Sequence, residues 1–437
     1  MPLHPAEAAL WRASPLSHAV RGLASVGNVQ RQRLASGLEV CLITNRQAPI
    51  VTTVLLYRVG GRDEAAGRSG AAHFLEHMMF KGSANYGPGE IDRRTQAQGG
   101  SNNAFTSHDL TAYYFSFAAD RWQEALAIER DRMTALTLDP AEVTSERQVI
   151  LEELAMYRDE PWDALELAVQ AELFPGHPYG VPVLGTEPDL AKLDRESLAE
   201  FHQRFYRPAN ALLVVAGDIG PETAQRIEAE FAGLPSAAIA RATVAGAPAL
   251  DGARRLERRH GEVARIVLAL PAPPPEHPDH PGLRLLATLL GGGRTSRLHR
   301  AFVDVGQLCL AASCGLAEAE LAAHLACSFE VLPDGDEAEV ERRLEDELAA
   351  LRDQPVGDEE LERGKQILVA DWVFQQERIH QQAITAALAL AHGDLEQPEK
   401  IVRRALEVDA NALRDLARRY LDPRAGSVFG VSLPEDE

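Results

Sequence analysis

The same order of predicted elements occurs twice along this chain, and the repetition limits the possible folds more than any single segment does. Residues 51–82 read as a strand, a polar loop, a short helix and a glycine stop, and residues 265–293 read the same way. Residues 142–153 and 360–371 also resemble each other at nearly the same offset. Any two α+β halves look alike at this level, but the repeated order favours two copies of one domain of about 200 residues.

The repeat predicts an α+β fold with two homologous domains. We place the N-terminal domain at residues 1–235 and the C-terminal domain at residues 263–437. Residues 236–262 between them begin with a stretch rich in Ala, Gly and Pro that has no clear periodicity, which is typical of a linker.

Four further segments of the first domain have clear local patterns. Residues 38–58 read as two strands with a turn at residues 45–49, and residues 104–117 read as one strand with alternating aromatic side chains. Long helices are predicted at about residues 120–136 and 140–158.

Charge and composition exclude several classes of protein. The 437 residues carry a formal net charge of −21, whereas a nucleic-acid-binding protein needs a basic face. No apolar run approaches the roughly 20 residues of a membrane span, so no membrane partner is expected. The four cysteines form no CxxC pair, and residues 1–21 lack a signal-peptide pattern. We therefore expect a cytoplasmic protein with reduced thiols.

The predicted helix at residues 71–80 contains the sequence His-Phe-Leu-Glu-His. His73 and His77 are one turn apart on one face, separated by about 40° around the axis, so both imidazoles can bind one metal ion. Glu76 projects from the same side and can reach a metal-bound water. This order is the inverzincin motif. The alternative is a solvated helix surface, but the helix is mostly apolar and burying these groups without a partner would be costly.

A catalytic zinc site needs a third protein ligand. The predicted helix at residues 140–158 offers four glutamates. Glu146 and Glu153 are seven residues apart and share a face, whereas Glu152 points elsewhere. Glu146 and Glu153 are therefore the better candidates, unless all four glutamates face solvent.

Several motifs together resemble a known family. They are HFLEHMMFKGS, SNNAFTSHDLTAYYF, SERQVILEEL, GHPYG and FYRPANALLVVAGD. This combination is similar to the pitrilysin family of zinc metallopeptidases, which includes insulin-degrading enzyme and the mitochondrial processing peptidase. The resemblance implies that each domain is a mostly antiparallel sheet packed against helices. It also implies that the chain forms half of a clam-shell chamber.

The resemblance implies a role for each candidate residue. His73, His77 and Glu153 would bind one Zn²⁺ per chain, Glu76 would be the general base that activates the zinc-bound water, and Glu146 would support the site. The reaction would be hydrolysis of peptide bonds in unfolded peptides or small proteins.

The resemblance also implies how substrate binds. Residues 103–106 resemble the edge strand to which the family's peptide substrates add as a further β-strand, with Asn103, Ala104 and Phe105 as the substrate-binding residues. From the residues alone, a plain hairpin strand would be the simpler interpretation.

The chain departs from the family pattern in its second half. Arg284, Ala287 and Thr288 stand where the first copy has His73, Glu76 and His77, so the second domain would be non-catalytic and would enclose substrate. The family also usually has an Arg and a Tyr seven residues apart, which contact substrate and the developing oxyanion. Val303 and Leu310 stand at those places.

Two kinds of assembly would fit the missing Arg and Tyr. A heterodimer in which a related subunit supplies them is favoured, and a homodimer of reduced or altered activity is the alternative. A non-catalytic scaffold subunit of a processing-peptidase-like complex is the competing function, although the intact ligand set speaks against it. A zinc hydrolase of small amides is disfavoured by the edge-strand segment.

Overall fold

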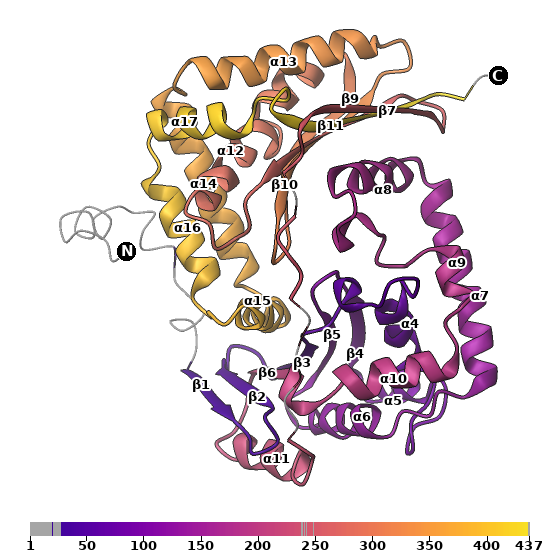
Figure 1. Ribbon diagram of the computed structural model, residues 1–437. Coiled ribbons are helices and arrows are strands. Elements are labelled where there is room, and N and C mark those ends of the chain that lie inside the picture. The colour runs from indigo at the N-terminus through magenta and orange to yellow at the C-terminus, as the bar shows by residue number, and fades with distance from the viewer. Residues whose placement is uncertain are drawn as a thin grey trace.

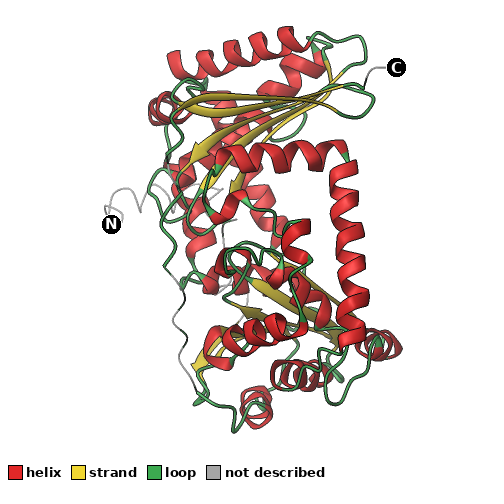
Figure 2. Ribbon diagram, turned by 45° about the vertical axis from the view of Figure 1, so that its right-hand side comes forward, coloured by secondary structure: helices red, strands yellow, loops and turns green. Residues whose placement is uncertain are grey.

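A computed structural model describes residue 20, residues 28–236, 239, 241, 243–247 and 249–435. The protein has two mixed β-sheets at opposite ends of the molecule, each covered by helices (Figures 1 and 2). The prediction of an α+β protein with two similar halves is confirmed.

The first sheet has six strands and belongs to the first half. Its order is β1-β2-β6-β3-β5-β4, and only the β2–β6 pair is parallel. The strands are β1 (Asn28–Arg33), β2 (Glu39–Thr44), β3 (Ile50–Tyr57), β4 (Ser101–Thr106), β5 (Thr111–Ala118) and β6 (Ala211–Gly217). Strand β6 is buried along its whole length, which matches its run of apolar residues. Strand β4 is an edge strand.

The second sheet has five strands in the order β7-β11-β8-β10-β9, with a parallel β7–β11 pair. Its strands are β7 (Gly252–Arg259), β8 (Arg265–Ala272), β9 (Cys309–Glu318), β10 (Ala323–Val331) and β11 (Gly426–Leu433). Strand β11, at the C-terminal end, lies between β7 and β8.

The helices of the first half are α4 (Ala71–Met78), α5 (Glu90–Ala97), α6 (Gln123–Thr134), α7 (Pro140–Asp159), α8 (Pro161–Leu173), α9 (Glu187–Leu190), α10 (Arg195–Phe205) and α11 (Thr223–Glu230). Those of the second half are α12 (His280–Gly291), α13 (Glu337–Asp353), α14 (Asp358–Gln375), α15 (Ile379–Ala391), α16 (Gln397–Glu407) and α17 (Ala410–Tyr420). No helix in the described ranges is long and apolar enough to cross a membrane.

Two sequence predictions need correction. Residues 104–117 are not one strand but the hairpin β4–β5, because the Ser107 hydroxyl accepts from the backbone of Asp109 and Leu110 and closes a tight turn. Residues 252–259, assigned to the linker, form strand β7. That strand was missed because Leu256 is its only large apolar residue and its pairing partner β11 is far away in sequence.

Each sheet receives a covering helix from the opposite half. Helix α15 packs on β3 and β6 of the first sheet through Ala383, Ala386 and Ala387, whose small side chains allow close approach. The Arg58 guanidinium, at the end of β3, donates to the carbonyls of Leu390 and Ala391 and so caps the C-terminus of α15.

Helix α8 makes the reciprocal contact. It follows the long helix α7, which leads from the first sheet towards the second (Figure 1). Its apolar residues Leu165 and Val169 pack on Val267 and Val428 of the second sheet. Neither half therefore buries both faces of its sheet with its own helices.

A buried ionic network also joins the halves. The Arg62 guanidinium lies 2.9 Å from Asp109 Oδ1, as an ion pair without hydrogen-bond alignment, and 2.8 Å from Glu320 Oε2 of the second half. Asp109 also accepts from the Tyr179 hydroxyl at 2.6 Å and from the Glu320 backbone N–H at 2.8 Å. Arg241 donates to the Asp109 carbonyl and to Glu320. Asp109 is the centre of this network.

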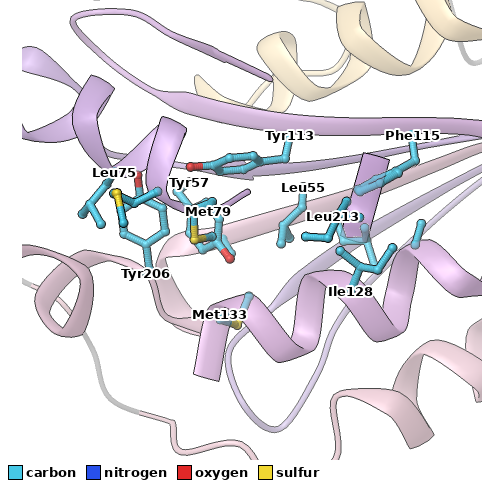
Figure 3. Packing of buried hydrophobic residues seen from close by; sticks show 14 of the residues in the cluster. Leu55, Tyr57, Leu75, Met79, Tyr113, Phe115, Ile128, Met133, Tyr206 and Leu213 are labelled. Atoms are coloured by element: carbon cyan, nitrogen blue, oxygen red, sulfur yellow. The ribbon is translucent and has the colours of Figure 1, made fainter. Parts of the chain in front are cut away.

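Helix α4 packs on the other face of the first sheet from α15. Figure 3 shows Leu75 and Met79 against Tyr57 and Tyr206, with Tyr113 beside them. All five side chains are buried. This contact fixes the rotation of α4 about its axis.

A histidine–glutamate pair lies within the second half. His280 is fully buried, and its two ring nitrogens lie 3.0 Å from the Pro273 carbonyl oxygen and 2.6 Å from Glu318 Oε1. Burial alone would raise the pKa of the Glu318 carboxyl. The hydrogen bond with His280 and the charge of Arg284 outweigh that effect and hold this pKa below its usual value.

We expect Asp109→Ala to lower the free energy of unfolding by about 3 kcal/mol, because it leaves the buried Arg62 charge with fewer compensating groups. Urea unfolding followed by tryptophan fluorescence measures the change. Asp120→Ala is the matched control, since Asp120 pairs with Arg121 at the surface and should contribute less than about 1 kcal/mol. Equal midpoints for the two variants would contradict a stabilising role for the network.

We expect the stability contributed by Glu318 to depend on pH. Because its pKa is lower in the folded than in the unfolded protein, the contribution is complete above the unfolded value of about 4.3 and is lost as the pH falls below it. Melting temperatures of wild type and Glu318→Gln should differ at pH 7, and the difference should shrink as the pH falls below about 4.3 and vanish once it is below the lowered pKa of the folded protein. A gap that stays constant with pH would contradict the prediction.

Candidate metal centre

Helix α4 begins at a constrained turn. Gly70 has a φ of 92°, and a Cβ there would lie 2.5 Å from the Leu184 carbonyl oxygen, so only glycine fits. The buried Glu64 carboxylate accepts from the backbone N–H groups of Gly70 and Ala72 and caps the helix N-terminus. These contacts set where the His73–His77 turn begins.

The structure brings His73, His77 and Glu153 together. One potential ligand atom of each lies within 4.8 Å of the others. Glu153 Oε2, from helix α7, is 3.8 Å from His73 Nε2 and 3.5 Å from His77 Nε2. Helix α7 packs against α4, which places Glu153, 76 residues after His77 in the sequence, beside the two histidines.

Glu146, two turns earlier on α7, is buried and contacts the other side of His77. Its Oε1 lies 2.9 Å from His77 Nδ1, and its Oε2 lies 2.7 Å from Lys81 Nζ. Because the Glu146 carboxylate can only accept a hydrogen bond, the neutral His77 ring carries its proton on Nδ1. The lone pair of the ring is then on Nε2, the nitrogen that faces Glu153. Sequence reasoning selected Glu146 but missed Lys81.

Glu76 lies on the same helix and faces the edge strand. Its Oε2 accepts from the Thr106 hydroxyl at 2.5 Å, at the end of β4. Burial raises the pKa of Glu76, while the Thr106 hydrogen bond opposes that rise. Thr106 is the last residue of the segment that resembles the family's edge strand, but no contact with Glu76 was predicted for it.

The donor set fits a zinc ion. Two imidazoles and one carboxylate form a known catalytic zinc set, and ligands at about 2.0–2.1 Å from a tetrahedral ion are about 3.3 Å apart, close to the separations of Glu153 Oε2 from the two Nε2 atoms. Burial, with His77 beside it, lowers the pKa of His73 to about 3, so the ring is neutral. His73 Nδ1 is buried without a hydrogen-bond partner in the described part of the chain. A metal at Nε2 would give the other ring nitrogen a partner and so offset part of the cost of burying this imidazole.

The predicted substrate segment lies on β4, whose outer edge has no strand beside it in the described ranges. Asn103 is exposed, and its Oδ1 accepts from the Ala104 backbone N–H, so this N–H points away from β5. Phe105 is partly buried on the α15 face of the sheet. The edge therefore offers main-chain groups for a further strand.

Val303 and Leu310 lie apart from these residues in the second half. Val303 is in a short π-helix (His299–Asp304) and packs on the core of that half. Leu310, at the start of β9, is 53% exposed. Neither side chain has a hydrogen-bond donor, as the sequence indicated.

Two models of one protein family match the chain. Residues 39–187 match "Insulinase (Peptidase family M16)", and residues 192–368 match "Peptidase M16 inactive domain". The second match runs from α10 in the first half to α14 in the second, and none of the candidate metal ligands lies within it.

Curated relatives carry the name zinc protease. A Mycobacterium leprae protein is 35% identical over 55% of this chain and 55% of its own length. YmxG of Bacillus subtilis is 30% identical over 63% and 66%, and PqqE of Helicobacter pylori is 30% identical over 63% and 64%. The aligned part thus spans less than two thirds of each relative.

Matches to solved structures cover more of this chain than the matches to curated relatives do. The crystal structure of a protease from Helicobacter pylori has a TM-score of 0.89 and 25% sequence identity, and the match covers 94% of this chain and all of that one. The periplasmic protease PqqL from Escherichia coli shares the fold, with a TM-score of 0.78 and 20% identity, over 93% of this chain and 48% of that one. From the two family models and these relatives, we conclude that this chain belongs to peptidase family M16, the insulinase or pitrilysin family of zinc proteases.

Proposed function

We propose that this protein is a zinc metalloendopeptidase subunit that hydrolyses peptide bonds in unfolded peptides or small proteins. The observation that carries the proposal is the convergence of His73, His77 and Glu153 around one point, with the Glu76 carboxylate one residue away from His77. His73, His77 and Glu153 would hold one zinc ion per chain. Zinc bound there would supply a water of lowered pKa and polarise a carbonyl.

Glu76 is the general base in this proposal. Thr106 occupies its Oε2 and fixes the carboxylate, which leaves Oε1 to take a proton from water and pass it to the leaving amine. Its raised pKa makes it a stronger base than a solvated carboxylate. Because Thr106 is on the edge strand, the same hydrogen bond fixes the base relative to a peptide bound there.

Substrate would bind to β4 as an additional antiparallel or parallel strand. The segment Asn103–Phe105 would bind it through the main-chain groups that face away from β5, those of Ala104, by hydrogen bonds that do not depend on the peptide's sequence. This mode requires an extended peptide, so folded proteins would be excluded.

A partner subunit would complete the site. Val303 and Leu310 cannot donate to an oxyanion, and one such donor is worth about 3 kcal/mol of transition-state stabilisation. The match covers 92% of the separately solved first half of PqqL but only 48% of the PqqL chain, so PqqL is about twice as long as the part that this chain matches. We propose a heterodimer with a related subunit that supplies the Arg and Tyr, with a homodimer as the alternative.

A non-catalytic scaffold subunit is the second candidate function. The observation that favours it is the absence of side-chain donors at Val303 and Leu310. The intact and clustered set of His73, His77, Glu153 and Glu76 favours the peptidase instead, since a scaffold has no need to keep these groups together.

We expect Glu146→Ala to weaken zinc binding about 10- to 100-fold, because His77 loses the partner that orients its ring. Competition with a chromogenic chelator measures the affinity. Glu152→Ala on the same helix is the control, since Glu152 is exposed and should leave the affinity unchanged. Equal affinities for both variants would contradict the role of Glu146.

We expect Glu76→Gln to retain one zinc per chain and to lose cleavage of a quenched fluorescent peptide, because the amide cannot take a proton. His77→Ala should lose both the metal and cleavage. Elemental analysis and the peptide assay measure the two properties. Cleavage at the wild-type rate by Glu76→Gln would exclude Glu76 as the base.

We expect the partner subunit, isolated by affinity purification from the source cell, to raise peptide cleavage by about 100-fold or more when added to this chain, in line with the value of an oxyanion donor. The control is partner added to Glu76→Gln, which should stay inactive. Full activity of the isolated monomer would rule out a shared site.

A further inference from the structure

We propose that the cavity between β4 and helices α14 to α16 is a specificity pocket that binds one large apolar side chain of the peptide substrate. This inference rests on the proposed function, because it assumes that a peptide adds to β4. The cavity has a volume of about 370 Å³ and lies at the junction of the two halves. Its apolar walls are Phe105, Leu110, Trp372, Leu388, Pro398 and Ile401.

Alternation along β4 separates the cavity from the metal centre. Asn102 donates to Asp92 of α5 and Thr106 donates to Glu76 of α4, so the even-numbered residues face these helices. Phe105 packs instead with the α15 cluster on the opposite face.

A peptide strand added to β4 would alternate with the same period of two residues. Its side chains would therefore point in turn towards the metal centre and towards the α15 face. Phe105 and Ser107, at the end of β4, both line the cavity, and Thr106 between them contacts Glu76. The residue that enters the cavity would thus be next to, or very near, the bond that is cleaved.

The charges on the cavity wall are already paired within the protein. Asp109 is bound to Arg62, and Glu320 is bound to Arg62 and Arg241. Glu318 is bound to His280, and its Oε2 accepts from Arg284. A charged substrate side chain would lose its hydration without gaining a free counter-charge, whereas an aromatic or long aliphatic side chain would gain by burial.

Thr385 of α15 gives a way to test the pocket. It lines the cavity and is only half-buried, so substitution there places a new side chain in the cavity with little effect on the core. Thr144 on α7 is exposed and far along the chain from this cavity, and provides a control for the same change of residue.

The experiment measures peptide binding to full-length Glu76→Gln protein loaded with zinc, by fluorescence anisotropy. The probes are labelled Ala/Ser decapeptides with one Phe, Gly, Glu or Lys at each position in turn. We expect one position at which Phe binds about tenfold or more tightly than Gly or Glu. Thr385→Phe should abolish this preference by filling the cavity, and Thr144→Phe should keep it. Thr385→Glu should shift the preference to Lys.

The outcomes separate this inference from the proposed function. Absence of a Phe preference at every position, or a preference that neither Thr385 variant changes, would overturn the pocket even if the unmodified protein cleaves peptides. A preference that responds to both variants supports the pocket even if no peptide is cleaved. Melting temperatures of all variants show whether they are folded. If Thr385→Phe does not fold, the Thr385→Glu variant alone tests the pocket.

Discussion

Burial of both faces of each sheet requires helices from both halves of the chain. Helix α15 covers the face of the first sheet opposite α4, and α8 covers one face of the second sheet, so each half exposes a large apolar surface without the other. This exchange makes the two halves one cooperative structure. It also fixes β4 relative to the second half, and the buried network around Asp109 adds directional contacts at the same junction.

The metal centre depends on a second packing contact, between α4 and α7. Helix α4 is apolar on the face that meets Tyr57 and Tyr206 (Figure 3). Its other face, which meets α7 and β4, carries His73, Glu76 and His77. Burial makes the His73 ring neutral and raises the pKa of Glu76, which suits one to bind a metal and the other to accept a proton. The cost of burying these groups explains why Glu146, Lys81 and Thr106 surround them with partners.

In the proposed function, the two faces of β4 divide substrate selection from catalysis. The α4 face of β4 holds the reactive groups, and the α15 face holds the cavity at the junction of the halves. A strand-like peptide would present alternate residues to the two faces. Selection by side chain and attack on the backbone could then use the same bound peptide without competing for space.

The sequence by itself determined the local features. The His73–His77 spacing, the shared face of Glu146 and Glu153, and the strand and helix patterns of the first half follow from periodicities of 3.6 and 2 residues. The family resemblance supplied residue roles that spacing alone could not assign. Tertiary structure decided which distant segments meet: α15 on the first sheet, β7 beside β11, and Thr106 and Lys81 at the site. These contacts join residues far apart in sequence, and a local pattern carries information only about neighbours along the chain.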